Sequence, residues 1–321
     1  MCPLLFSIQR QLYGVSIAIH AIIVQLQSSL NCWFLDDGTL AGDPATVEAD
    51  LRLITEEGLK VGLQLNASKC EYSAHNYEVS GGSPLFTCKP VSFTDLTLLG
   101  SALGDHAESN CLAPKIEALE RFACTLKLLQ PHQAFFLLKN AMALPRLTYL
   151  LRTTNLVNQP LLGKYDAVIR CTLENLLNIS LSDIQWKQAS LPVKHGGLGV
   201  RSAVDVALPA FISSTMQSRD LCHEIAVIES VLGSNSAQSL WLSRVGLAVA
   251  PDSAAQGAWD LPLIEKAKNI ILLSARDEAD RARMLASTAA MSGDWLEALP
   301  APSLGLMLSE SELRISVSLR L

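Results

Sequence analysis

The sequence lacks the cysteine spacings that mark a zinc site or a disulfide framework. None of its 8 cysteines forms a C-x-x-C pair, and none stands at knuckle spacing from the 6 histidines. Zinc is therefore not indicated. Cysteines scattered through a chain of this length are more typical of buried, reduced thiols in an intracellular protein, cytoplasmic or nuclear.

Long apolar runs are also missing. The most apolar N-terminal stretch, Val15–Leu26, is interrupted by His20 and is shorter than the ~20 residues that a membrane-spanning helix needs. It has neither the charged start nor the small-residue cleavage site of a signal peptide. Internal repeats and low-complexity tracts are absent as well. The sequence thus predicts no membrane partner and no targeting segment.

Charged residues are few, at 17%, whereas hydrophobic residues make up 49% of the 321 residues. This composition excludes disorder as the dominant state and supplies enough apolar material for sizeable cores. A chain of this length is long for one core, so two domains, or one domain with an appendage, are expected.

The net charge of −6 argues against nucleic acid, but its distribution does not. Residues 1–111 carry 5 Lys/Arg and 12 Asp/Glu, residues 112–174 carry 8 and 4, and residues 175–321 carry 12 and 15. A basic middle segment beside an acidic one is typical of a phosphate-facing module next to a carboxylate metal site. Helical segments also produce such an imbalance by chance.

Hydrophobic periodicity and turn signals predict short strands and helices in the first third of the chain. Asp43 followed by Pro44 is a favoured helix start, and Gly58 is a natural stop. The expected elements are a helix over 14–30, strands over 31–35 and 39–41 joined by an Asp36-Asp37-Gly38 turn, a helix over 43–58, and strand-like runs at 63–65 and 69–72.

From Pro114 onwards the pattern becomes helical. The cluster Gly196-Gly197-Leu198-Gly199 lacks the G-K-[ST] ending of a phosphate-binding loop, so we interpret it as a turn. We expect helices over 114–129, 131–142 and 165–176, a turn or loop over 191–201, and further helices to about 290 with links at 233–236 and 250–257.

Adjacent Asp36 and Asp37 are the first candidates for chemistry. Phosphoryl transfer needs two divalent ions held by clustered carboxylates, and a tight hairpin turn can project two neighbouring carboxylates together. A polar turn without function is the simpler interpretation of the dipeptide alone, because Asp-Gly is a favoured turn sequence.

Four motifs, taken together, favour the functional interpretation of Asp36 and Asp37. They are Phe34-Leu35-Asp36-Asp37-Gly38, the Gly-Leu-x-Leu-Asn-x-x-Lys-Cys-like run over 58–71, Leu98-Leu99-Gly100 and the opening Cys2–Ser7. In this combination they resemble the reverse transcriptase of non-LTR retrotransposons. Segments 190–202, 295–300 and 314–321 are similar to later regions of the same elements, so the resemblance covers nearly the whole chain.

The resemblance implies an α+β partial palm, with a β-hairpin and a small antiparallel sheet with helices, over 1–111. A helical thumb-like region over 112–180 and a helical extension over 181–321 follow. It also implies an RNA or DNA template-primer and deoxynucleotide triphosphates as partners.

The implied catalytic residues are Asp36 and Asp37, which hold Mg²⁺ or Mn²⁺, and Lys69, which steadies the nucleotide phosphates or protonates pyrophosphate. Leu99 and Gly100 correspond to the primer grip. An ordinary exposed strand lysine is an equal alternative for Lys69, and a solvated helix face is the alternative for the basic residues. The basic residues expected to contact the duplex are Lys115, Arg121, Lys127, Lys139, Arg146 and Arg152.

Two departures from the family pattern concern activity. No acidic residue precedes Asp36, so the family's first catalytic aspartate has no counterpart, and the downstream Cys/His cluster is missing. We therefore expect a fragment of an RNA-directed DNA polymerase that is inactive as this chain. The alternatives are a non-catalytic nucleic-acid-binding remnant that keeps the basic thumb, and a degenerate protein with no retained activity.

Overall fold

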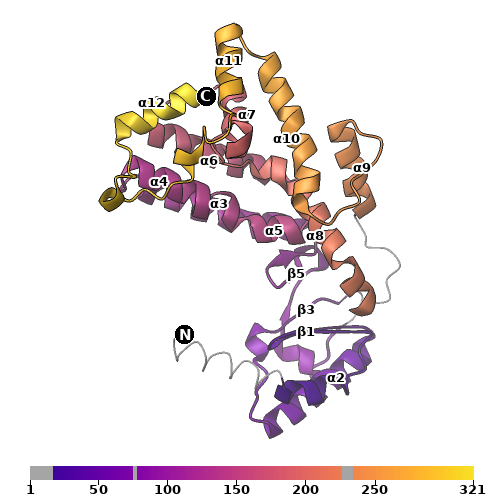
Figure 1. Cartoon of the computed structure of the whole chain (residues 1–321). Coiled ribbons are helices and arrows are strands. Elements are labelled where there is room, and N and C mark those ends of the chain that lie inside the picture. The colour runs from indigo at the N-terminus through magenta and orange to yellow at the C-terminus, as the bar shows by residue number, and fades with distance from the viewer. Residues whose placement is uncertain (1–16, 75–77, 226–233) are drawn as a thin grey trace. The chain divides into compact units, whose positions relative to one another are not determined.

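A computed structural model describes residues 17–74, 78–225 and 234–321. Over these residues the chain is mostly helical, with three separate two-stranded sheets (Figure 1). This confirms the expected combination of helices with a β-hairpin and a short antiparallel sheet. The residues up to Leu96, with a short stretch from Leu221, form a smaller compact unit, and the remainder forms a larger one. The opening Cys2–Ser7 motif lies outside the described residues.

An antiparallel hairpin opens the smaller unit. Its strands are β1 (Leu30–Phe34) and β2 (Asp37–Ala41), and their register leaves Leu35-Asp36 as a two-residue turn. The sequence predicted the hairpin but placed the turn one residue later and made it longer. The acidic pair therefore straddles the end of the turn and the start of the second strand.

Gly38 explains this difference in register. It lies in β2 opposite Trp33, and a Cβ at Gly38 would lie 2.6 Å from the indole ring. Gly38 thus makes room for a large cross-strand aromatic side chain and is not a turn residue. The Trp33 indole N–H donates to Asn31 Oδ1 (2.7 Å), and Asn31 Nδ2 donates to the Ile23 carbonyl (3.0 Å). The hairpin is in this way tied to the helical residues 17–23.

The helix expected over 14–30 is shorter. Its described part begins at residue 17 and ends at residue 23. A turn ends the helix, since the amides of Gln25 and Leu26 donate to Ile22 O and Ile23 O, and beyond this turn Asp50 binds amides that a continued helix would use. The Asp50 carboxylate accepts from the backbone of Gln27 (3.0 Å) and from both the backbone (2.8 Å) and the hydroxyl (2.6 Å) of Ser28. A buried long-range partner therefore overrides the local helical pattern.

Helix α2 (Pro44–Lys60) begins as expected and ends two residues past the expected glycine. The Asp43 side chain caps its first turn by accepting from two backbone amides. Ile54 of α2 packs with Ile22 and Leu26 to form the core of the smaller unit. This core is small, so few apolar contacts hold the unit together.

The rest of the smaller unit is built from short pieces. Strands β3 (Glu71–Tyr72) and β4 (Lys89–Pro90) pair in parallel. The strand expected over 63–65 does not form, because no described strand includes these residues. The Leu63 amide instead donates to Gly58 O (2.8 Å) at the end of α2. Three 3-10 turns complete the unit, Ala67–Lys69, Pro84–Thr87 and Phe93–Asp95.

The larger unit begins with a second hairpin and a long helix. Strands β5 (Thr97–Leu98) and β6 (Ser101–Ala102) pair antiparallel, and α3 (Asp105–Leu126) follows. The helix start expected at Pro114 and the domain boundary expected after residue 111 both fall inside α3. The helix begins earlier because Leu112, before the proline, is fully buried, and this burial outweighs the proline signal.

The remaining described elements are helices and 3-10 turns. Those expected over 131–142 and 165–176 are present, and the link expected over 250–257 ends where α10 begins. Residues 234–236 begin α9 and do not form a link. The elements are α4 (Pro131–Leu137) with a π-helical turn Leu138–Met142, α5 (Thr148–Thr153), α6 (Pro160–Leu177), α7 (Asp183–Ala189), α8 (Ala203–Ile225), α9 (Ser234–Val245), α10 (Gln256–Leu273), α11 (Glu278–Ala286) and α12 (Glu310–Arg320), with 3-10 turns at Leu144–Arg146, Val193–His195, Asp294–Leu296 and Pro302–Leu304.

One apolar core joins the regions expected to be a thumb and a separate extension. Leu162 and Leu177 of α6 share this core with Leu198, and with Leu313 and Val317 of α12. The boundary expected after residue 180 therefore separates no cores. The sequence could not predict this, because these residues meet only through long-range packing.

The glycine cluster is a turn, as expected, and α12 holds it in place. A Cβ at Gly197 would lie 2.0 Å from the Leu191 carbonyl oxygen, so only glycine fits. The buried Arg320 guanidinium donates to the carbonyls of Gly197 (2.9 Å), Val193 (2.7 Å) and Ser292 (3.1 Å). Backbone carbonyls thus satisfy this buried cation.

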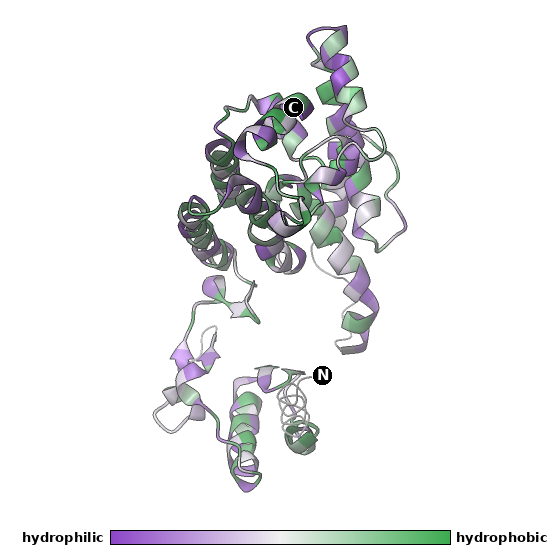
Figure 2. Ribbon diagram, turned by 60° about the vertical axis from the view of Figure 1, so that its left-hand side comes forward, coloured by the Kyte–Doolittle hydropathy of each residue, from purple (hydrophilic) through white to green (hydrophobic). Residues whose placement is uncertain are grey.

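Polar and apolar residues alternate along the helices of the larger unit (Figure 2). In the part of the chain that the structure describes, every helix is too short or too polar to cross a membrane.

Candidate functional site

The turn that presents the acidic pair has an unusual backbone. Leu35 has φ 59°, a left-handed conformation that hairpin turns usually give to Gly, Asn or Asp. A side chain of this size in that region costs roughly 1–3 kcal/mol. The hairpin maintains this conformation because the pairing of Trp33 with Gly38 sets the strand register.

Asp36 and Asp37 are both exposed at this tip. Neither carboxylate has an ion-pair or hydrogen-bond partner among the described residues. Carboxylate oxygens are the hard ligands that Mg²⁺ and Mn²⁺ prefer. No group of three or more His, Cys, Asp or Glu side chains that could hold a metal ion gathers within the described residues. Among the described residues, therefore, no third His, Cys, Asp or Glu side chain joins the two adjacent carboxylates.

Lys69 is exposed at the end of the 3-10 turn Ala67–Lys69, and not on a strand as expected. The turn forms because the Lys69 amide bonds to Asn66 O (3.0 Å). No ion pair joins Lys69 to Asp36 or Asp37. In the part of the chain that the structure describes, no ion pair engages its ammonium, and the structure does not bring it together with the acidic tip.

Leu99 and Gly100 form the turn of the β5–β6 hairpin in the larger unit, with φ 48° and 78°. The Tyr149 hydroxyl donates to the Leu99 carbonyl (2.7 Å), and the Ser101 hydroxyl donates to the Thr153 carbonyl (3.0 Å). These bonds fix the hairpin against α5. Its tip is exposed.

The basic residues of α3 do not share one face. Successive residues of a helix are rotated by about 100°. Lys115, Arg121 and Lys127 are six residues apart, so they lie on three different sides of α3, all exposed. Arg121 also forms an ion pair with Glu117 (3.7 Å). The structure thus disperses the continuous basic face that the sequence predicted.

Of the other three basic residues, Lys139 is not accessible. Its side chain is 5% exposed, and Nζ donates to Leu296 O (2.8 Å) and pairs with Glu297 (2.9 Å). Arg152 is half-buried and donates to Gln217 (2.6 Å). Both hold the fold of the larger unit together. Arg146 is exposed.

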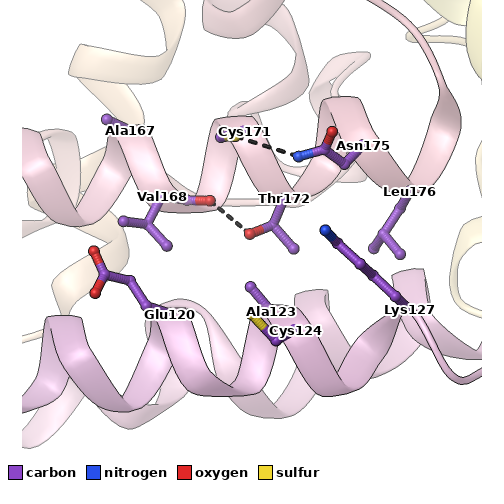
Figure 3. Close-up of a pocket in the computed structure, with 10 residues that line it drawn as sticks. All are labelled: Glu120, Ala123, Cys124, Lys127, Ala167, Val168, Cys171, Thr172, Asn175 and Leu176. Carbon is purple, nitrogen blue, oxygen red and sulfur yellow. Dashed lines mark hydrogen bonds between the residues drawn. The ribbon is translucent and has the colours of Figure 1, made fainter.

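The sequence did not predict a groove of about 380 Å³ between α3 and α6. Glu120 and Cys124 of α3, with Lys127 directly after this helix, face Cys171 and Asn175 of α6 across it (Figure 3). Asn175 Nδ2 donates to Cys171 Sγ (3.3 Å). The Lys127 side chain rises from α3 towards α6, so it forms part of this groove. Only the packing of two distant helices creates this feature, which has no local sequence signal.

Comparison of the chain with known proteins gave no matching family model and no significant match among curated proteins.

Proposed function

We propose that the chain derives from the polymerase region of a retroelement reverse transcriptase, and that its β1–β2 tip is a weak half-site for one divalent cation. The observation that carries this proposal is the presentation of Asp36 and Asp37 at a turn with a left-handed leucine. Both carboxylates are exposed, and neither has a partner within the described ranges. The order of the motifs, from the acidic pair through Lys69 to Leu99-Gly100, supports it.

The chemistry of this family explains why the half-site is weak. Two-metal phosphoryl transfer activates the primer hydroxyl with one ion and stabilises the leaving pyrophosphate with the other. The carboxylates that hold both ions come from two elements, and this chain has no acidic residue before Asp36. One ion can still bind to the adjacent pair. Lys69, as a mobile cation, suits the phosphates of a nucleotide bound nearby.

Mn²⁺ binding tests the half-site directly. We expect Mn²⁺ to broaden the NMR signals of the β1–β2 turn in the full chain, and we expect Asp36→Asn and Asp37→Asn each to remove this effect. Asp43→Asn is the matched control, because it removes a nearby exposed carboxylate while asparagine keeps the helix cap. Broadening that survives both tip substitutions would contradict the half-site.

Primer extension tests the expected inactivity. With Mg²⁺ or Mn²⁺ the chain should not extend a primer, because the ion that activates the hydroxyl lacks a shared ligand. Metal assistance is worth several kcal/mol, and each ~1.4 kcal/mol is a factor of ten in rate. Fusion to the fingers and first palm strand of a related element should restore synthesis that depends on Asp36. Robust synthesis by the unfused chain would refute the argument.

A second candidate is sequence-independent binding of nucleic acid by the larger unit. The exposure of Lys115, Arg121 and Arg146 favours it, although these residues do not form one stripe. Such binding rests on phosphate contacts and requires no metal site.

A further inference from the structure

Cys70 and Cys88 are brought together by the short parallel sheet of the smaller unit. The register pairs Glu71 with Lys89, and Lys89 N donates to Cys70 O (2.9 Å). The two cysteines immediately precede this pair, so they occupy matching positions just before the two neighbouring strands. Residues in register on adjacent strands direct their side chains to the same face of a sheet.

The two thiols differ in exposure. Cys88 is 8% exposed, and Cys70 is half-buried. Each thiol also has a local acceptor, Asn66 O for Cys70 (3.3 Å) and Pro84 O for Cys88 (3.7 Å). The pair therefore has the neighbouring placement and shared orientation that a disulfide requires.

We propose that Cys70 and Cys88 form a reversible intramolecular disulfide when the chain meets a low-molecular-weight disulfide of the glutathione type. The more accessible Cys70, as its thiolate, attacks one sulfur of the oxidant, forms a mixed disulfide and releases one thiol. Cys88 then attacks the Cys70 sulfur and releases the second thiol. The protein loses two hydrogens, and the oxidant is reduced to two thiols.

Burial, followed by the contact with Cys88, raises the pKa of the Cys70 thiol. Less thiolate is therefore present at neutral pH, and the first step is slow but accelerates as pH rises. Reaction with the second thiol is intramolecular, so the mixed disulfide does not accumulate.

The bond closes a ring of 19 residues, from Cys70 to Cys88. It also connects the residue that follows the 3-10 turn Ala67–Lys69 covalently to the residue before β4. Closing such a loop restricts the open states of the segment. If Lys69 has the role in the proposed function, oxidation also holds it in place, but formation of the bond does not depend on that role.

The test uses the full chain, treated with oxidised glutathione at about pH 8 and mapped by peptide mass spectrometry. We expect a peptide pair linked through Cys70 and Cys88 that a reducing agent separates. Amide hydrogen exchange at Lys89 and Val91, which donate to Cys70 O and Tyr72 O, should slow about tenfold or more.

Matched variants make the result specific. Cys70→Ser and Cys88→Ala should each abolish the linked pair and the slower exchange, and alanine at the buried position avoids a new polar group. Cys32→Ser, in β1 of the same unit, should change neither, and circular dichroism confirms that each variant folds. A persistent glutathione adduct on Cys70, linkage to another cysteine, or unchanged exchange after oxidation would overturn the proposal. The mapping involves no metal, so its failure is separate from failure of the cation site.

Discussion

Replacing Asp166 with asparagine should change how the stability of the larger unit depends on pH. Asp166 lies on α6 and is 7% exposed. Its carboxylate accepts from Ser202 Oγ (2.5 Å), Ala203 N (2.7 Å) and Val204 N (3.2 Å) at the start of α8. A buried acidic group of one helix therefore caps another helix that lies far along the chain.

Burial raises the pKa of the Asp166 carboxyl from 3.8 to about 6, although the hydrogen bonds from Ser202 and the two amides act in the opposite direction. The folded chain holds this proton more tightly than the unfolded chain does. The contribution of Asp166 to stability is therefore greatest below the unfolded pKa and decreases as pH rises through about 6. A shift of about two units, at ~1.4 kcal/mol each, corresponds to roughly 3 kcal/mol.

Urea denaturation followed by far-UV circular dichroism measures this difference. Asparagine cannot ionise, and its loss of one acceptor is independent of pH. The free energy of unfolding of the wild type minus that of Asp166→Asn should therefore fall by roughly 2–2.5 kcal/mol between about pH 4 and pH 7, most of the full difference. Asp252→Asn, at an exposed position, serves as the control and should give a small constant difference.

Two results would refute this reasoning. A difference that stays constant with pH would mean that the carboxyl titrates alike in the folded and unfolded chain. A difference that grows with pH would mean that the three hydrogen bonds and the field at the start of α8 outweigh the cost of burial.

Three further predictions concern the hairpin and the basic residues. Gly38→Ala should destabilise the β1–β2 hairpin by about 1–3 kcal/mol, because the new Cβ meets the indole opposite it. The melting temperature of the smaller unit should fall, and Gly81→Ala, with open space around it, is the control. Lys139→Met should destabilise the larger unit by about 1–3 kcal/mol in urea denaturation, since a buried carbonyl loses its donor, and an unchanged midpoint would contradict the burial of this lysine. Joint replacement of Lys115 and Arg121 by glutamine should reduce the slope of the logarithm of the duplex-binding constant against the logarithm of salt concentration by about 2, whereas Lys139→Met should leave it unchanged. An equal slope in all variants would mean that the Lys115 and Arg121 side chains are only solvated.

Local patterns were sufficient for several elements of the fold. Asp43 before a proline predicted the start of α2, because capping and first-turn proline act within a few residues. Strand-forming residues around an acidic pair predicted the β1–β2 hairpin. The glycine cluster predicted a turn, since Gly196 and Gly199 have positive φ. Each of these features depends on interactions between near neighbours.

The candidate site was predicted only in part. The sequence alone placed Asp36 and Asp37 at the hairpin tip, but it could not show that Gly38 faces Trp33 and so shifts the turn by one residue. It also predicted Lys139 as a surface cation, whereas packing buries this side chain against the Leu296 carbonyl. A lysine looks the same in the sequence whether its partner is water or a carbonyl more than a hundred residues away.

The sequence by itself determined that helices dominate after the first third of the chain, where α2 is capped and that the acidic pair lies at a turn, because backbone conformational preferences and short-range hydrogen bonds decide these features. Only the tertiary structure decided that α3 runs through Pro114, that α12 shares a core with α6, and that Cys70 meets Cys88. These outcomes depend on burial and strand register between residues distant in the chain, and no local pattern encodes them.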